Sequence, residues 1–111
     1  MSRKEKYLKE LDKLKKVIVK NYKPEKIILF GSLAWGKFGP DSDADLFIIK
    51  NTKKRFGERM DEVEIMAGRA RVRIPTDIIV LTPKEVSRRL YLEDFFVQDI
   101  ITKGKVLYAK R

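Results

Sequence analysis

The stretch IILFGSLAWGKFGPDSDADLFII, residues 27–49, decides the fold expected for this chain. It opens with the unbroken apolar run 27–30, which is typical of a strand buried on both faces. The run ends at Gly31, and a loop rich in turn-forming residues follows. A second apolar run carries Asp43 and Asp45 at its start. The stretch therefore predicts two strands joined by a loop.

Asp43 and Asp45 are two residues apart, so on a strand their side chains lie on the same face. Two carboxylates held together repel each other, and burying them is costly unless a cation joins them. Carboxylate oxygens are ligands that suit magnesium, and a pair of divalent cations is the usual remedy. The pair therefore predicts a site for two Mg²⁺ ions, with Mn²⁺ as the alternative metal.

Gly31 and Ser32 stand between the first strand and a short helical turn predicted at residues 33–35. Glycine allows another group to approach the backbone closely. Backbone N–H groups at a helix start bind phosphate oxygens. A phosphate cradle beside metal-binding carboxylates describes a site for nucleotidyl transfer.

The Gly31-Ser32 pair, separated by ten residues from Asp-Ala-Asp-Leu at 43–46, resembles the motif of the polymerase-beta-type nucleotidyltransferases. The fuller string GSLAWG…PDSDADLFI is most similar to the minimal nucleotidyltransferases, a small single-domain branch often paired with a HEPN-type toxin. This resemblance implies that Gly31 and Ser32 hold the triphosphate of a nucleoside triphosphate. It also implies that Asp43 and Asp45 bind two magnesium ions.

The same resemblance places a third metal carboxylate on the next core strand, which is Asp77 here, and gives it a part in activating the incoming hydroxyl. It further implies transfer of AMP from ATP to a tyrosine hydroxyl of the partner toxin, so that the protein acts as an antitoxin. The sequence departs from the family where an arginine often follows the motif's alanine. Here Trp35 follows, and Lys37 or a neighbouring chain is expected to supply the charge at the nucleotide.

Asp77 is unusual for its position even without the resemblance. It lies within the apolar run of residues 74–81, which predicts a third strand, and carboxylates are depleted from strands. The alternative to a metal ligand is a surface-facing aspartate on an edge strand.

The remaining segments complete an α/β (α+β) fold in a single domain over residues 1–111. Apolar residues at helical spacing predict helices over residues 3–20, 57–70 and around 95–101. A further helix is expected to start at the capping box of Thr82, and a last strand is expected at 106–108. We expect a small mixed sheet with helices mainly on one face and the active site at one edge of the sheet. The aromatic residues Tyr91, Phe95 and Phe96 are expected in the core, with an exposed partner patch as the alternative.

Composition excludes several kinds of site. The chain has no histidine and no cysteine, which excludes zinc sites built on them and any disulfide framework, and is compatible with a reducing cytoplasm. No apolar stretch approaches the roughly 18 residues that would span a bilayer. We therefore expect a cytoplasmic protein with no membrane segment.

Charge leaves two interpretations open. The chain holds 26 basic and 16 acidic residues, a net charge of +10, which favours polyanionic partners. The simpler interpretation is that lysines solvate the surface, because no aromatic residues interleave them to stack on bases. Arg69, Arg71 and Arg73 form a small basic cluster that either complements a helix C-terminus or contacts phosphate or a partner.

Two functions compete with catalysis. The chain could be a nucleotidyltransferase fold that neutralises its partner by contact alone, or a basic nucleic-acid-binding domain. Self-association into a homo-oligomer is compatible with each of these.

Overall fold

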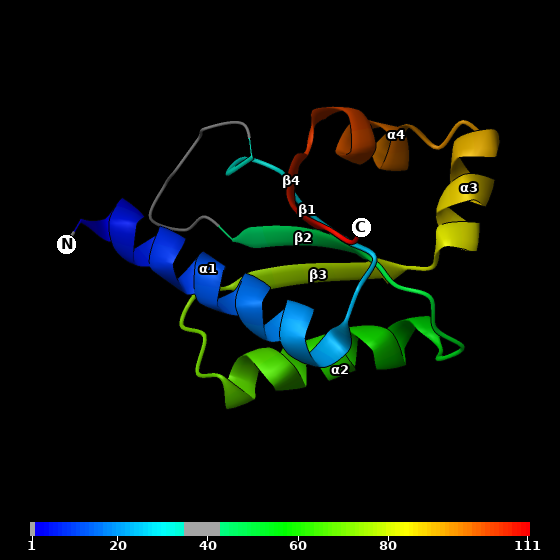
Figure 1. The fold of residues 1–111 in the computed structure, drawn as a ribbon. Coiled ribbons are helices and arrows are strands. Elements are labelled where there is room, and N and C mark those ends of the chain that lie inside the picture. Colours follow the sequence, from blue (N-terminus) through cyan, green and yellow to red (C-terminus); the bar gives the residue numbers. More distant parts are fainter. Residues whose placement is uncertain (1, 35–42) are drawn as a thin grey trace.

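The computed structural model describes residues 2–34 and 43–111 and places four helices and four strands within them (Figure 1). In chain order they are α1 (Arg3–Tyr22), β1 (Lys26–Phe30), β2 (Ala44–Ile49), α2 (Phe56–Arg69), β3 (Thr76–Leu81), α3 (Pro83–Tyr91), α4 (Phe95–Lys103) and β4 (Lys105–Ala109). Apart from the short helical turn predicted at residues 33–35, which is described only in part, each predicted element is present with the expected type. The boundaries differ by one or two residues.

The four strands form one mixed sheet in the order β3-β2-β1-β4. β1 is antiparallel to both of its neighbours, β2 and β4, whereas β2 and β3 are parallel. The connection between the parallel pair contains α2, as parallel strands require a crossover. The predicted α/β fold with a mixed sheet is therefore confirmed.

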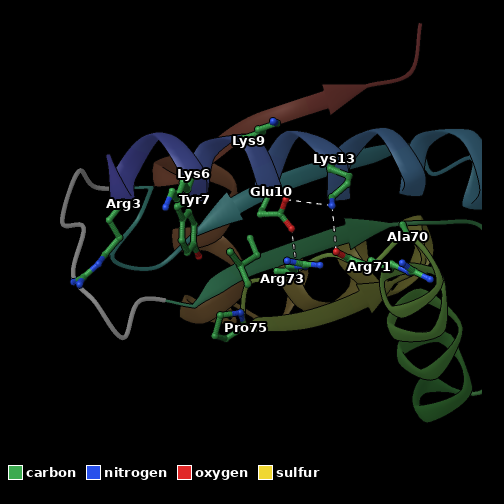
Figure 2. A pocket seen from close by; sticks show the side chains of 11 residues that line it. Arg3, Lys6, Tyr7, Lys9, Glu10, Lys13, Ala70, Arg71, Arg73 and Pro75 are labelled. Atoms are coloured by element: carbon green, nitrogen blue, oxygen red, sulfur yellow. Dashed lines mark hydrogen bonds and ion pairs between the residues drawn. The ribbon is translucent and has the colours of Figure 1, made fainter. Parts of the chain in front are cut away.

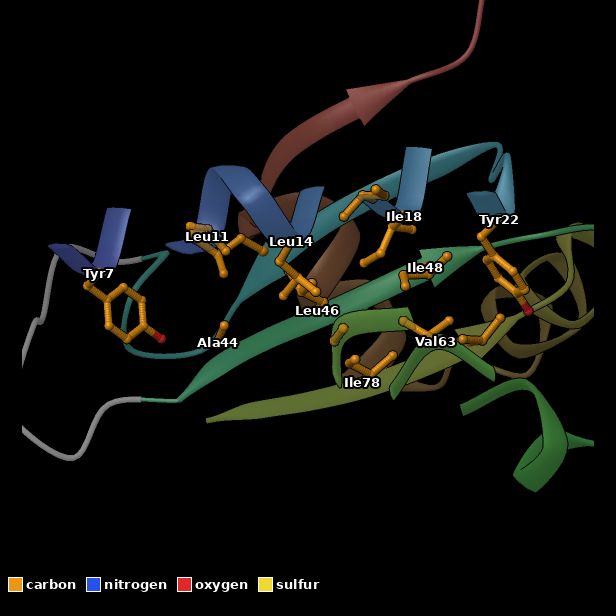
Figure 3. Packing of buried hydrophobic residues seen from close by; sticks show 14 residues of the cluster. Tyr7, Leu11, Leu14, Ile18, Tyr22, Ala44, Leu46, Ile48, Val63 and Ile78 are labelled. Atoms are coloured by element: carbon orange, nitrogen blue, oxygen red, sulfur yellow. The ribbon is translucent and has the colours of Figure 1, made fainter. Parts of the chain in front are cut away.

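Alternating residues of the strands supply two cores, one on each face of the sheet. On the larger face, Leu14 and Ile18 of α1 and Val63 of α2 pack against Leu46 and Ile48 of β2 (Figure 3). The smaller core lies on the other face.

In this smaller core, Ile28 and Phe47 of the sheet pack with Val86 of α3 and with Val97 and Ile100 of α4. The two long helices thus cover one face, and the two short helices cover part of the other (Figure 1).

Local sequence explains where the helices begin and end. Ser2 and Glu5 form a capping box at the start of α1, and Lys23 ends that helix in the left-handed region with φ of 52° before Pro24. The predicted capping box of Thr82 and Glu85 is present at the start of α3.

The aromatic residues near the α3–α4 junction are not in the core. Tyr91 is 86% exposed, Phe95 75% and Phe96 52%, so the prediction that they are buried was wrong. The physical reason is that each helix is only two to three turns long and presents few positions to the sheet. Among their residues, Val86, Val97 and Ile100 occupy the buried positions.

No helix within the described residues is long and apolar enough to cross a membrane.

Candidate functional site

The sheet brings two of the predicted site residues together. Asp45 of β2 pairs in register with Asp77 of β3. Both residues lie on the face of the sheet that carries Phe47 and the smaller core, opposite the larger core. Asp43 directly precedes β2 and is exposed. β3 is an edge strand and Asp77 is exposed, so its position also fits the surface-facing alternative.

The charge environment of Asp45 reflects this arrangement. Burial is the main cause that raises the pKa of its carboxyl group, and the charges of Asp77 and Asp43 raise it further. The charges of two neighbouring carboxyl groups therefore act on Asp45 near the start of β2. A bound cation would remove the repulsion that disfavours the charged form of Asp45.

Gly31 lies directly against Asp45. Its φ of 77° is in the left-handed region, which glycine adopts at little cost. In addition, a Cβ atom at this position would overlap the Asp45 carboxylate. Both the backbone conformation and the close approach thus require glycine, and the residue predicted to bind phosphate adjoins a predicted metal ligand.

The segment after Gly31 is described only in part. Residues 32–34 form a hydrogen-bonded turn, Ser32 is exposed, and the predicted helical turn at 33–35 extends beyond the described residues. The backbone of the turn at 32–34 is the part of the predicted phosphate site that the structure describes. Trp35 and Lys37, the second of which was predicted to contact the nucleotide, lie outside the described residues.

Tyr7 of α1 is a neighbour of the site that the sequence did not reveal. Its side chain is 8% exposed and lies at the end of the large core nearest Ala44 (Figure 3). Burial raises the pKa of its hydroxyl, and the charges of Asp43 and Asp45 raise it further, so the phenol stays protonated. In the sequence Tyr7 is one member of an apolar helical stripe, and only its polar tip distinguishes it.

The donor set fits a hard divalent cation. Asp43, Asp45 and Asp77 offer only carboxylate oxygens, which magnesium prefers, and the charges of Asp77 and Asp43 add to burial in raising the pKa of Asp45. However, within residues 2–34 and 43–111, no three acidic side chains lie close enough to form a complete metal site by themselves. The oxygens of a nucleotide triphosphate are the natural remaining ligands.

Comparison with known proteins identifies the family. Residues 12–111 match the family described as polymerase beta, nucleotidyltransferase. The chain belongs to the polymerase beta nucleotidyltransferase family. This membership supports nucleotidyl transfer as the general activity, a nucleotide as substrate and the divalent metals that such domains generally use.

Structural comparison agrees on the fold of this nucleotidyltransferase. A protein from Sulfolobus solfataricus, whose crystal structure carries the description "putative nucleotidyltransferase", superposes with a TM-score of 0.60 at 20% sequence identity. The match covers 96% of this chain and 86% of the other. No curated protein matches the sequence. At this identity the likeness shows a common fold and nothing about substrates.

Proposed function

We propose that this nucleotidyltransferase moves a nucleoside monophosphate, AMP from ATP, onto a hydroxyl group in a metal-dependent reaction. The observation that carries the proposal is the pairing of Asp45 with Asp77 in register while Gly31 lies directly against Asp45. A structural role alone gives no reason to gather mutually repelling carboxyl groups beside a glycine in the left-handed region. Binding of a metal-bound nucleotide explains why these groups lie together.

Each site residue has a part in this scheme. Asp43, Asp45 and Asp77 hold two magnesium ions. These ions, when bound, neutralise the charge that develops on the transferring phosphoryl group. Gly31 and Ser32 hold the triphosphate through backbone N–H groups and the Ser32 hydroxyl, and Lys37 adds a positive charge.

Bonds and protons balance in the transfer. The acceptor oxygen forms a bond to the α-phosphorus, and the bond from that phosphorus to the bridging oxygen of pyrophosphate breaks. Asp77 accepts the proton of the acceptor hydroxyl as the new bond forms. Pyrophosphate leaves with the electron pair of the broken bond.

The proposed acceptor is a tyrosine of a HEPN-type toxin, which AMP transfer would silence, so that this protein acts as an antitoxin. Support comes from the resemblance of GSLAWG…PDSDADLFI to the minimal nucleotidyltransferases. The exposed side chains of Tyr91, Leu92 and Phe95 supply apolar surface on which a partner protein could bind.

A transfer assay tests the function. The protein is incubated with magnesium, ATP labelled at the α-phosphate and the product of the neighbouring gene. We expect label on the partner with the wild type and none with Asp43→Asn/Asp45→Asn. The matched control is Asp61→Asn/Glu64→Gln, which removes two exposed carboxylates from α2 and should transfer at the wild-type rate.

Two outcomes contradict the proposal in different ways. A stable complex with the partner but no label supports a binding module that neutralises its partner by contact. Equal transfer by the wild type and the Asp43→Asn/Asp45→Asn variant removes the carboxylates from the mechanism.

A further inference from the structure

Two aromatic side chains lie beside the carboxylate site. Phe30, the last residue of β1, pairs in register with Asp45 and directly precedes Gly31. Phe30 and Asp45 share the face of the sheet that carries the smaller core. Residues directly opposite each other on antiparallel strands have Cβ atoms about 5 Å apart. Phe30 is therefore an immediate neighbour of the residues that we assign to the metal ions and the phosphates.

Phe96 of α4 is the second aromatic residue. Its ring meets the ring of Phe30 edge to face, with 5.8 Å between the ring centroids and 89° between the ring planes. Phe30 is partly buried, whereas Phe96 is 52% exposed. We name the pair of Phe30 and Phe96 the aromatic wall. It stands one strand away from Asp45 and keeps part of its aromatic surface accessible.

The fold holds Phe96 in place. Asp94, the N-cap residue of α4, accepts hydrogen bonds from the backbone N–H groups of Phe96 at 3.0 Å and Val97 at 3.2 Å. Val97 is itself buried in the smaller core. Just after α4, a Cβ atom on Gly104 would overlap Ile28 of β1, so this end of the helix lies in close contact with the strand. An exposed ring on an element held at both ends loses little conformational entropy when a ligand binds.

A groove close to the carboxylates offers no comparable surface. It has a volume of about 850 Å³ and lies between α1 and the loop that joins α2 to β3 (Figure 2). It reaches the start of β2 at Pro75, whose carbonyl oxygen accepts a hydrogen bond of 2.9 Å from the Ala44 N–H. Tyr7 is the aromatic residue of its described lining, and this side chain is only 8% exposed. The groove therefore offers charge and backbone, but no accessible aromatic face.

We propose that the aromatic wall binds the base of the nucleoside triphosphate, with Phe96 as the main contact. The inference rests on the proposed function, in which Gly31 and Ser32 hold the triphosphate. The base of a nucleotide is joined to its phosphates through a single sugar, so it must lie close to these residues. Phe30 directly precedes Gly31, and the aromatic wall is therefore within that short reach.

The chemistry of the site favours a base over an apolar segment of a partner protein. Every base has a π face, and base–aromatic stacking contributes substantially to affinity. A protein segment on the aromatic wall would also bring apolar surface next to Asp45, and burial of an unpaired carboxylate is costly. A nucleotide brings metal ions to the carboxylates together with its base.

The aromatic wall also determines which bases bind well. Phenylalanine rings offer no conventional hydrogen bond, so they distinguish bases by the size of the stacked ring system. Purines, which have two fused rings, should therefore bind more tightly than pyrimidines.

Isothermal titration calorimetry with excess magnesium tests the proposal. It compares ATP with inorganic tripolyphosphate, which carries three linked phosphates and no base. Phe96→Ala removes the exposed ring, and Phe96→Tyr keeps it. The matched control is Phe95→Ala, which removes a 75% exposed ring of the same type one position earlier, where the side chain points in a different direction from the helix axis.

We expect Phe96→Ala to weaken ATP binding about tenfold, which is within the range for loss of one base–aromatic stack. Its affinity for tripolyphosphate should equal that of the wild type, which also shows that the variant is folded. Phe96→Tyr and Phe95→Ala should bind ATP like the wild type. ATP should bind the wild type more tightly than UTP does, and Phe96→Ala should reduce this difference.

Three results overturn the proposal. Equal losses of ATP and tripolyphosphate binding in Phe96→Ala mean that the ring supports the phosphate site rather than the base. Equal losses of ATP binding in Phe96→Ala and Phe95→Ala mean that any apolar side chain of this helix start serves. A Phe96→Ala variant that keeps its ATP affinity but no longer forms a complex with the partner protein means that the aromatic wall belongs to the partner interface.

Failure of this inference is distinguishable from failure of the proposed function. A wild type that binds ATP more tightly than tripolyphosphate through Phe96, yet transfers no label, supports the base site and contradicts the transfer reaction. Label transfer that Phe96→Ala leaves unchanged, together with unchanged ATP affinity, supports the transfer reaction and contradicts the base site. A wild type that binds neither ATP nor tripolyphosphate contradicts both.

Discussion

At the scale of single residues, Asp45 imposes a free-energy cost on the fold. Burial and the charges of Asp77 and Asp43 raise the pKa of its carboxyl group. A carboxyl group with a higher pKa in the folded than in the unfolded chain destabilises the fold at pH values above the folded pKa. The penalty disappears as the pH falls below the unfolded pKa. Activity and stability therefore make opposite demands on this position.

Asp45→Asn should consequently raise the melting temperature of the metal-free protein at neutral pH, and Asp43→Asn/Asp45→Asn should be at least as stable as the wild type. The gain should vanish as the pH falls below about 4, where an ordinary aspartate is protonated. Thermal melting of wild type and variants across this pH range measures the difference. A lower melting temperature for Asp45→Asn at neutral pH would show that the carboxylate stabilises the fold and would remove it from the catalytic set.

Gly31→Ala should destabilise the protein by about 1–2 kcal/mol from the left-handed backbone alone, with more from the overlap with Asp45. Gly57→Ala is the matched control, because nothing lies within 4 Å of the added Cβ and α2 favours alanine. We expect it to stabilise by about 0.4–1 kcal/mol. Denaturant unfolding of both variants measures these changes in the free energy of unfolding. Combining Gly31→Ala with Asp45→Ala should recover the part of the loss due to overlap.

At the scale of elements, a single arginine joins α2 to the start of α3. Arg59 is 6% exposed, and its Nη1 is 2.7 Å from Glu85 Oε1 while its Nε donates to the carbonyl of Lys54 at 2.8 Å. Glu85 is also the acidic member of the α3 capping box with Thr82. The Arg59 guanidinium is the main cause that lowers the pKa of the Glu85 carboxyl group.

Arg59→Met should therefore cost about 2 kcal/mol, because it leaves the buried Val80 carbonyl, the Lys54 carbonyl and the Glu85 carboxylate without their donor. Glu85→Gln should cost less than about 1 kcal/mol, since solvent screens this partly exposed carboxylate. The stabilisation due to Glu85 is present above its unfolded pKa and is lost as the pH falls through its lower folded pKa. Urea unfolding at neutral and acidic pH measures both effects. A Glu85→Gln variant with the same loss at every pH would contradict this account.

The elements and the carboxylate pair could be predicted because their signals are local. Helical stripes, the capping box at Thr82 and the spacing of Asp43 and Asp45 depend on residues close in sequence. The contacts that define the site depend instead on residues far apart in the sequence. The pairing of Asp45 with Asp77 depends on the register between β2 and β3. The closeness of Tyr7 to Asp43 and Asp45 depends on where α1 crosses the sheet.

Exposure at the α3–α4 junction was predicted incorrectly for the same reason. Spacing alone identifies a helical face but not which tertiary element, if any, covers it. Phe96 is the intermediate case, since it is 52% exposed and still makes an edge contact with Phe30 at 5.8 Å between ring centroids. Arg59 is a charged residue that the fold buries, and no spacing in the sequence singles it out.

At the scale of the whole molecule, a net charge of +10 on 111 residues makes the folded state repel itself. Added salt screens this repulsion, with a Debye length of about 8 Å near physiological ionic strength. The melting temperature should therefore rise between low salt and about physiological salt. Differential scanning calorimetry in sodium chloride provides the measurement, and a melting temperature that falls with salt would mean that ion pairs such as Lys16–Asp12 outweigh the net repulsion.

The order of the strands also affects how the protein is made. β1 is synthesised early, yet one of its two neighbours is β4, at the other end of the sequence. A growing chain therefore displays the free backbone groups of β1 along one side until Lys105–Ala109 have left the ribosome, and such an edge readily pairs with another chain. Chains whose synthesis stops before Lys105 would keep this strand edge unpaired. Chaperones and proteases should therefore act most strongly on these shortened chains.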